Sequence, residues 1–298
     1  MKRFLLKSLL FVCILFVLLM FIEYLLRSTA FGHDYNKKYL DNNANNIQIL
    51  ALGNSLIWSG LNPEFFEYNS FNAANNGQNY YLSQEILNKY FDNFDNLEMV
   101  ITQIDYEYLI IPPKSHYLYT INYGFKSEKI SDFFIFSNFP LQNAIIRIID
   151  YYFLDKRFRH GEQQPLGNHL STKTANIDEL KRDYRHDNLF RISDDDLNNI
   201  SINTEIILDM AQKLATKNIK LLLITTPTHP IRRDWMNKEY VNIIHDVANY
   251  VTSMATNIEY LDFLYDYDFN ELDFSDAYHI NASGAEKMSK KIAQYLTF

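Results

Sequence analysis

The fold is decided by the stretch Ile47-Gln-Ile-Leu-Ala-Leu-Gly-Asn-Ser55, a short apolar run that ends in a glycine and a serine. Turn-forming residues flank the apolar part on both sides, which is the pattern of a buried strand. Similar runs occur at Met99–Ile104, Leu221–Thr226 and Ile258–Leu261, with a weaker candidate at Asn69–Ala73. The sequence therefore predicts about five strands, most of them buried on both faces.

Helical patterns lie between these apolar runs. Apolar residues of 204–217 recur at the spacing of one helix face, residues 240–254 carry a second stripe, and residues 86–91 carry a shorter one. Alternating strands and helices predict an α/β fold, an open sandwich with a parallel sheet covered on both faces. In such sheets, sites form beyond the carboxyl ends of the strands.

The N-terminus holds an apolar run, Ser8–Leu26, of 19 residues with a single acid, Glu23. This length is just sufficient to cross a bilayer as a helix. Three basic residues precede the run, which predicts a cytoplasmic N-terminus and an exported body. A cleaved signal peptide and a buried core helix are the alternatives. We favour a transmembrane signal anchor at residues 1–27, because the run exceeds a signal-peptide core and no Ala-x-Ala-like cleavage site follows.

The rest of the chain is expected to form one domain. Residues 28–46 are polar and rich in asparagine, which predicts a connector to a domain at 47–298. Residues 106–203 break the strand and helix alternation and are too long for an ordinary connection. We interpret them as an insertion that forms a cap or a surface for docking a partner.

Composition excludes several classes of function. The net charge is −8, and residues 41–298 alone carry −12, with 34 acids against 22 bases. Such an acidic body repels phosphate backbones, so we expect no nucleic-acid partner. The single cysteine, Cys13, lies in the apolar run and is silent about compartment. We expect no cofactor and no metal, because the sequence contains neither a phosphate-binding loop nor metal-ligand spacing.

Two distant segments carry residues suited to nucleophilic catalysis. Gly53-Asn54-Ser55 ends the first predicted strand, although this triplet alone is an ordinary turn. Asp276 and His279 stand three residues apart, so the carboxylate can accept the imidazole Nδ1 proton and leave Nε2 to deprotonate a hydroxyl. Ser283 and Glu286 have capping-box spacing, which predicts a helix start just after the histidine.

For two other polar segments we favour a structural interpretation over a role in binding or catalysis. His229 follows the third long strand and either contacts substrate or is a plain loop histidine, which is the interpretation we favour. Asp194–Asp196 lacks the glycine and terminal glutamate of a calcium loop and is expected to begin a solvated helix.

These segments resemble the SGNH (GDSL-like) hydrolase superfamily. Gly53-Asn54-Ser55 is similar to its first block, Gly-Asp-Ser, and Asp276-Ala-Tyr-His279 to its last, Asp-x-x-His. The resemblance implies a flavodoxin-like three-layer sandwich with a mostly parallel five-stranded sheet, and a catalytic triad of Ser55, His279 and Asp276. It also implies an oxyanion hole formed by the N–H groups of Ser55 and Gly77. The third block departs, because Gln103-Ile-Asp105 stands where the family has an asparagine.

Within the superfamily, the anchor, the first block and the long insertion look like the surface-polysaccharide branch. This resemblance implies an extracytoplasmic serine esterase or O-acetyltransferase that acts on an acylated cell-surface glycan. It would be a single-pass protein of the cell membrane, periplasmic in a Gram-negative cell, with a multispanning acyl-transferring membrane protein as a partner.

Two rival functions remain open at this point. The first is a non-catalytic glycan-binding or scaffold member of a polysaccharide export or modification complex, which the departing third block and the insertion favour. The second is a purely structural membrane protein, which ranks last because it leaves the pairing of the two distant motifs to chance.

Overall fold

The computed structural model describes residues 1–29, 32–127, 129–138, 140–154, 165–176, 178, 180 and 191–296. The chain divides into two compact units. The first comprises Met1–Lys37 and Ser115–Glu162, and the second comprises Lys38–Lys114 and Gln163–Phe298. All of the site residues expected from the sequence belong to the second unit.

The second unit is built on a five-stranded sheet in which every neighbouring pair is parallel. The strand order is β2-β1-β3-β4-β5, the order of a flavodoxin-like doubly wound sheet. The strands are β1 (Ile49–Ala51), β2 (Ser70–Asn72), β3 (Met99–Gln103), β4 (Lys220–Thr225) and β5 (Ile258–Asp262). The expected α/β fold is confirmed, and the sheet is entirely parallel.

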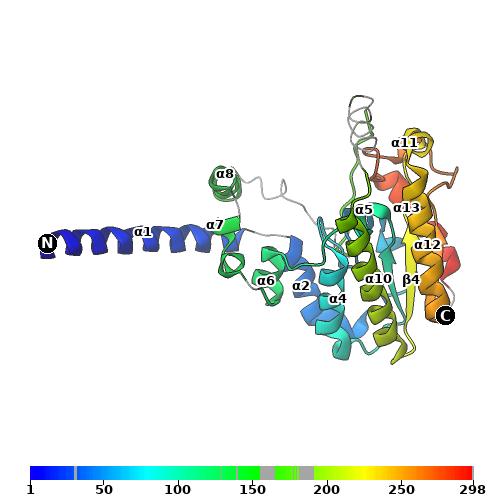
Figure 1. Cartoon of the computed structure of the whole chain (residues 1–298), viewed down its shortest axis with the longest axis horizontal. Coiled ribbons are helices and arrows are strands. Elements are labelled where there is room, and N and C mark those ends of the chain that lie inside the picture. Colours follow the sequence, from blue (N-terminus) through cyan, green and yellow to red (C-terminus); the bar gives the residue numbers. More distant parts are fainter. Residues whose placement is uncertain are drawn as a thin grey trace. The chain divides into compact units, whose positions relative to one another are not determined.

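Helices cover both faces of this sheet (Figure 1). On one face α4 (Tyr80–Tyr90), α10 (Asp194–Ala215) and α12 (Lys238–Met254) pack side by side. On the other face lie α3 (Ser55–Gly60) and α13 (Ala282–Tyr295), which contact each other. Short helices complete the unit: α5 (Tyr106–Leu109), α11 (Pro230–Trp235) and the 3-10 turns η1 (Ala44–Asn46), η2 (Pro63–Phe65), η3 (Phe91–Asn93) and η6 (Glu271–Asp273).

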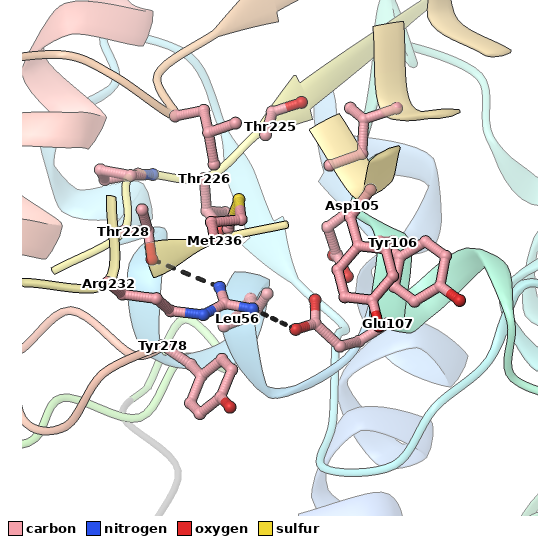
Figure 2. Close-up of a pocket in the computed structure, with 14 residues that line it drawn as sticks. Leu56, Asp105, Tyr106, Glu107, Thr225, Thr226, Thr228, Arg232, Met236 and Tyr278 are labelled. Atoms are coloured by element: carbon pink, nitrogen blue, oxygen red, sulfur yellow. Dashed lines mark hydrogen bonds and ion pairs between the residues drawn. The ribbon is translucent and has the colours of Figure 1, made fainter. Parts of the chain in front are cut away.

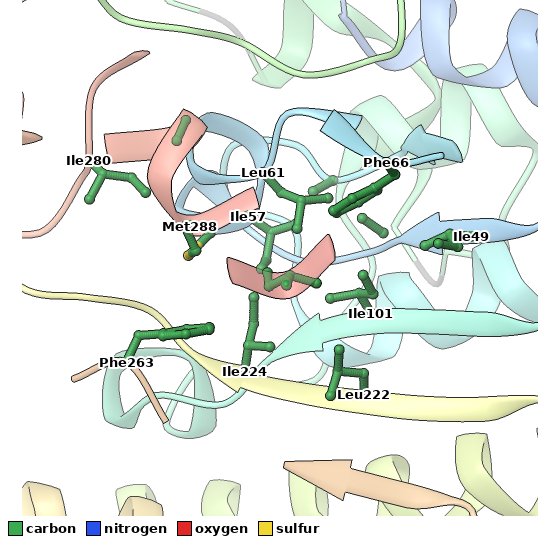
Figure 3. Packing of buried hydrophobic residues seen from close by; sticks show 14 of the residues in the cluster. Ile49, Ile57, Leu61, Phe66, Ile101, Leu222, Ile224, Phe263, Ile280 and Met288 are labelled. Atoms are coloured by element: carbon green, nitrogen blue, oxygen red, sulfur yellow. The ribbon is translucent and has the colours of Figure 1, made fainter. Parts of the chain in front are cut away.

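Alternate strand residues supply the core beneath α3 and α13. Because side chains alternate across a strand, Ile49, Ala51 and Ile101 point to one face together with Leu222 and Ile224. They meet apolar residues of the two covering helices, among them Ile57 of α3 and Met288 of α13 (Figure 3). Ala285 and Ile292 of α13 belong to the same cluster. Burial of each large aliphatic side chain contributes about 1.5–3 kcal/mol, so this layer fixes the two helices that carry and follow the site residues.

The helix α10 begins earlier than its apolar stripe indicated. It starts at Asp194, where Ser193 and Asp196 form a reciprocal capping box. The expectation that Asp194–Asp196 begin an exposed helix is confirmed for Asp194 and Asp195, which are exposed, while Asp196 is partly buried. The buried side of the helix extends from Ile200 through Ile207 and Met210.

The first unit consists of helices outside the sheet. These are α1 (Lys2–Ser28), α6 (Tyr117–Tyr123), the 3-10 turn η4 (Ile130–Phe133), α7 (Ile135–Asn138) and α8 (Leu141–Tyr152). In the described part of the chain, α1 is the one helix that is long and apolar enough to cross a membrane. The expected connector at 28–46 contains a helix, α2 (Gly32–Asn43). The parts of the expected insertion at 155–164 and 181–190, including His160 and His186, lie outside the described residues.

Candidate active site

Ser55 is placed by the turn that follows β1. Gly53 has a φ of 148°, and a Cβ there would lie 2.7 Å from Gln103 Oε1, so the turn accepts only glycine. Asn54 caps α3, with its side chain accepting from the backbone N–H of Leu56 at 2.8 Å. Ser55 is therefore the first residue of α3, half-buried at the carboxyl edge of the sheet.

The structure brings the three expected catalytic residues together. Ser55 Oγ lies 2.8 Å from His279 Nε2, although the two residues are 224 positions apart in sequence. His279 Nδ1 lies 2.9 Å from Asp276 Oδ2 and 3.0 Å from Oδ1. The carboxylate, the imidazole and the hydroxyl thus form a continuous hydrogen-bonded line, which is the geometry that activates a serine.

Asp276 is held in place by its own turn. Its Oδ1 accepts from the backbone N–H groups of Tyr278 and His279, each at 2.8 Å. Burial raises the pKa of Asp276, but the hydrogen bonds and the charge of His279 outweigh it and bring that pKa below its usual value. The carboxylate is consequently ionised at neutral pH and able to orient the imidazole.

The segment carrying Asp276 and His279 is anchored at both ends. The backbone N–H of Ser275 donates to His279 O at 2.9 Å, and Phe274 forms an antiparallel bridge with Ile280. Asn281 then caps α13 by accepting from the N–H groups of Ser283 and Gly284.

The predicted capping role of Ser283 is wrong. Its hydroxyl donates instead to Asp273 Oδ1 at 3.0 Å. Asn281 is the cap instead. A Cβ at Gly284 would lie 2.4 Å from Asp273 O, so α13 starts in close contact with η6.

The loop after β2 lies beside the nucleophile turn and contains Gly77. The N–H of Asn75 donates to Gly53 O at 3.1 Å, and the N–H of Gln78 donates to Asn75 O at 3.1 Å. Gly77, with a φ of 71°, stands exposed in that turn. The oxyanion roles of Gly77 and Ser55 stay predictions.

Asn75 is a residue that sequence reasoning missed. It is buried, its Oδ1 accepts from the N–H of Asn76, and its Nδ2 has no hydrogen-bond partner. An unpaired buried amide is costly and calls for an explanation, which a bound oxygen atom would provide. Gly77 is the residue that indicates this loop in the sequence. Nothing in the sequence distinguishes Asn75 from the other asparagines of the loop.

Gln103 is the last residue of β3. It belongs to the segment Gln103-Ile-Asp105, which stands where the SGNH pattern has an asparagine. Its Oε1 accepts from the N–H of Asn54 at 3.2 Å, and its Nε2 donates to Asp105 Oδ2 at 2.9 Å. Both polar atoms of this side chain are therefore engaged within the protein. Gln103 ties the nucleophile turn to β3.

A second residue that sequence reasoning missed is Arg232, in a small pocket next to the site. The pocket has a volume of about 20 Å³, and Leu56 and Tyr278, the chain neighbours of Ser55 and His279, are in its lining. The buried guanidinium of Arg232 forms an ion pair with Glu107 and donates a hydrogen bond to Thr228 Oγ1 at 3.3 Å (Figure 2). It also lies 4.1 Å from the centre of the Tyr278 ring.

His229 has a structural role in the same region. It is buried, and its Nδ1 accepts from the N–H of Ile231 at 3.2 Å at the start of α11. Burial lowers the pKa of His229, which keeps the ring neutral and able to accept this hydrogen bond. These contacts agree with its interpretation as a loop histidine.

Comparison with known proteins gives limited similarities. A family profile matches residues 173–297, which is less than half of the chain. No curated protein matches it significantly. A solved structure from Streptococcus pneumonia, provisionally described as a platelet activating factor, is similar at 10% identity and a TM-score of 0.46, covering 97% of this chain and 99% of that chain.

A GDSL-like lipase from Bacteroides thetaiotaomicron is similar at 13% identity and a TM-score of 0.42, covering 88% of this chain and 97% of that chain. At such low identities and TM-scores, these similarities add nothing to the functional argument. That argument rests on the residues of the site.

Asp105 gives a prediction on the pH dependence of stability. Burial and the nearby charge of Glu107 raise the pKa of Asp105 to about 7, against hydrogen bonds from Tyr108 and Gln103 and the charge of Arg232. Between the unfolded pKa and about pH 7, the folded state holds a proton that the unfolded state has lost, so this group reduces stability as pH rises.

We expect Asp105→Asn, which keeps the capping oxygen, to remove this loss. Relative to the wild type, the variant should gain at least about 1 kcal/mol of unfolding free energy between pH 4 and pH 8. Urea unfolding at both pH values measures it. An equal difference between the two proteins at both pH values would contradict the raised pKa.

Proposed function

We propose that this protein is a serine acyl esterase or O-acyltransferase that uses Ser55, His279 and Asp276 as its catalytic triad. The observation that carries the proposal is the hydrogen-bonded line from Ser55 Oγ through His279 to Asp276. It joins two segments that lie at opposite ends of the folded domain's sequence. A turn serine alone is common, but a histidine and a carboxylate aligned on it serve to generate a nucleophile.

The reaction follows from the three positions. His279 Nε2 removes the hydroxyl proton of Ser55 as Oγ attacks the ester carbonyl carbon, and Asp276 stabilises the imidazolium that forms. The tetrahedral intermediate collapses, the ester C–O bond breaks, and His279 gives its proton to the leaving alcohol oxygen. Water or a sugar hydroxyl then attacks acyl-Ser55, loses its proton to His279, and Ser55 recovers that proton as it leaves.

We assign the stabilisation of the oxyanion to three donors. Two are the N–H groups of Ser55 and Gly77, as the resemblance to SGNH hydrolases implies. The third is the side chain of Asn75. Its Nδ2 is buried without a partner, and its backbone N–H donates to Gly53 O at 3.1 Å, which holds the residue beside the nucleophile turn. Asn75 would replace the amide that the third block of the superfamily supplies, since Gln103 is committed to Asn54 and Asp105.

The substrate we propose is an O-acetylated glycan. This choice rests on the resemblance to the surface-polysaccharide branch of the SGNH superfamily. The small pocket next to the site, of about 20 Å³, has space for little more than one water molecule, and its lining contains neither Ser55 nor His279, so it carries no argument about the acyl group.

The cellular setting we propose rests on α1 and on the resemblance. A membrane-spanning α1 with the cytoplasmic N-terminus would hold the catalytic unit outside the cytoplasm, at the cell surface or in the periplasm. The acceptor would be a cell-surface polysaccharide, and the acyl donor would reach the site through a multispanning membrane protein. Water as the final acceptor gives an esterase, and a sugar hydroxyl gives a transferase.

A non-catalytic glycan-binding or scaffold protein is the second candidate. The observation that favours it is Gln103, which stands near the place of an oxyanion asparagine and is engaged by other residues. Substitution of Ser55 separates the two functions, because binding of a glycan or complex partner survives Ser55→Ala while ester turnover does not.

The proposal predicts covalent labelling of Ser55. A fluorophosphonate probe should label the wild type, should fail on Ser55→Ala, and should react at least about 100-fold more slowly with His279→Gln, because the general base is lost. In-gel fluorescence measures it, with Ser253→Ala on the exposed face of α12 as a matched control that labels normally. A folded wild-type protein that never labels, or labelling that persists in Ser55→Ala, would overturn the proposal.

The oxyanion assignment gives a separate prediction. Asn75→Ala should lower kcat on a 4-nitrophenyl acetate substrate by about 100- to 1000-fold and leave KM nearly unchanged, because the donor acts on charge that develops in the transition state. Steady-state kinetics measures it, and Asn76→Ala, next to it but exposed, serves as the control. An unchanged kcat in a folded Asn75→Ala protein would exclude the side chain as a donor.

A further inference from the structure

The helix α8 has its polar and apolar residues in unusual places. Arg147 and Asp150 are each only 7% exposed, while Ile145 and Ile149 are 48% and 42% exposed. Phe153, just after the helix, is 77% exposed. A helix on the surface of a soluble protein turns its charges to water and its isoleucines to the core. In α8 the two charged residues are buried, while Ile145, Ile146 and Ile149 are exposed.

Two polar side chains of α8, Arg147 and Tyr152, bond to the C-terminal end of α1 and the residue after it. Arg147 Nε donates to Thr29 Oγ1 at 2.9 Å, just beyond the end of α1. The hydroxyl of Tyr152 is hydrogen-bonded to Ser28 Oγ. Both hydrogen bonds thus hold α8 against the C-terminal end of α1. Of the four isoleucines of α8, Ile148 packs against the core of the unit, while Ile145, Ile146 and Ile149 are exposed.

The same end of α1 is packed and capped by other parts of the unit. Glu23 is buried, and its carboxylate accepts from the backbone N–H groups of Ile135 and Phe136 at the start of α7, at 2.9 and 3.1 Å. Arg27 pairs with this carboxylate at 2.7 Å. Around these charges, Leu26 forms a small apolar core with Leu118, Ile135 and Ala144. Helices α7 and α8 are therefore fixed to the last turns of α1.

The length of α1 sets the level at which this packing occurs. The apolar run Ser8–Leu26 has 19 residues, so it rises about 28 Å as a helix, close to the roughly 30 Å of a bilayer core. The residues of α1 before Ile22 are exposed or partly buried, and only Glu23 and Leu26 are buried by the rest of the unit. A helix that spans the bilayer over this run would put α8 at the boundary between hydrocarbon and headgroups.

We propose that the apolar face of α8, formed by Ile145, Ile146, Ile149, Tyr152 and Phe153, lies in the lipid headgroup region of the membrane that α1 spans. Most apolar residues of α1 before Ile22 are exposed as well, and α8 contacts the C-terminal end of the same helix. An amphipathic helix at this level inserts its apolar face about 5–10 Å into the boundary of headgroups and acyl chains. Tyr152 suits that level, where aromatic side chains with a polar tip gather.

The proposal is independent of the chemistry of Ser55. It requires only that α1 spans a bilayer and that the first unit keeps its packing. It gives the expected insertion a specific role, since residues 130–154 would fix the outer end of the anchor against the membrane surface.

The test uses the full-length chain in nanodiscs of phosphatidylcholine and phosphatidylglycerol. In a Cys13→Ser background, Ile149→Cys and Phe153→Cys are each labelled with an environment-sensitive fluorophore. We expect a lipid that carries a spin label near its headgroup to quench the emission of both roughly twofold or more, while aqueous iodide quenches little. Leu15→Cys within α1 is the control for deep lipid contact, and Glu205→Cys on α10 is the control for exposure to water.

Three results are distinguishable. Quenching by the spin-labelled lipid confirms the proposal. Strong iodide quenching with no lipid effect would mean that α8 faces water and would overturn it. Emission that neither agent quenches would mean that protein covers the face, either a partner or a second copy, and would also overturn it. Lipid quenching at Leu15→Cys verifies in each case that α1 is inserted.

Discussion

The hydrogen bond between Ser55 Oγ and His279 Nε2, 2.8 Å long, is the contact on which the functional account depends. Ser55 is held by the turn after β1 and His279 by the turn before α13, so the sheet and its covering layer must form before the two can meet. The parallel arrangement makes this meeting possible, because the carboxyl ends of its strands lie along one edge. The apolar layer of Ile57, Ala285 and Met288 then fixes α3 against α13. The packing that stabilises the fold therefore also sets the positions of Ser55 and His279 relative to each other.

Polar residues around the site act mainly to hold these two turns. Gln103 bridges Asn54 and Asp105, and Asn281 caps α13 directly after the histidine. Because each amide side chain has its polar atoms engaged, the turns are fixed by directional contacts as well as by packing. Asn75 differs, since its Nδ2 is buried without a partner. This contrast distinguishes Asn75 from Gln103 and Asn281, the amide side chains that hold the two turns. The proposed mechanism uses the unpaired amide and leaves the paired ones as support.

The strand positions, the parallel sheet and the three residues Ser55, Asp276 and His279 could be predicted because each depends on a local pattern. Short apolar runs predict buried strands, and Asp-x-x-His predicts a carboxylate within reach of its imidazole. The start of α10 and the cap at Asn281 were harder, since capping depends on which competing polar side chain reaches the backbone. Arg232, Asn75 and the buried charges of α8 could not be predicted from sequence. Their importance comes from burial and partners, which only the packed structure supplies.

The central claim, that Ser55 becomes acylated through the action of His279, is tested most directly by trapping the intermediate. The full-length protein is mixed with 4-nitrophenyl acetate, quenched with acid within the turnover time, and digested for tandem mass spectrometry. The account predicts an acetyl group on Ser55 in the wild type and almost none in His279→Gln. Release of 4-nitrophenol with no acetyl group on Ser55, or with the acetyl group on another residue, would contradict it.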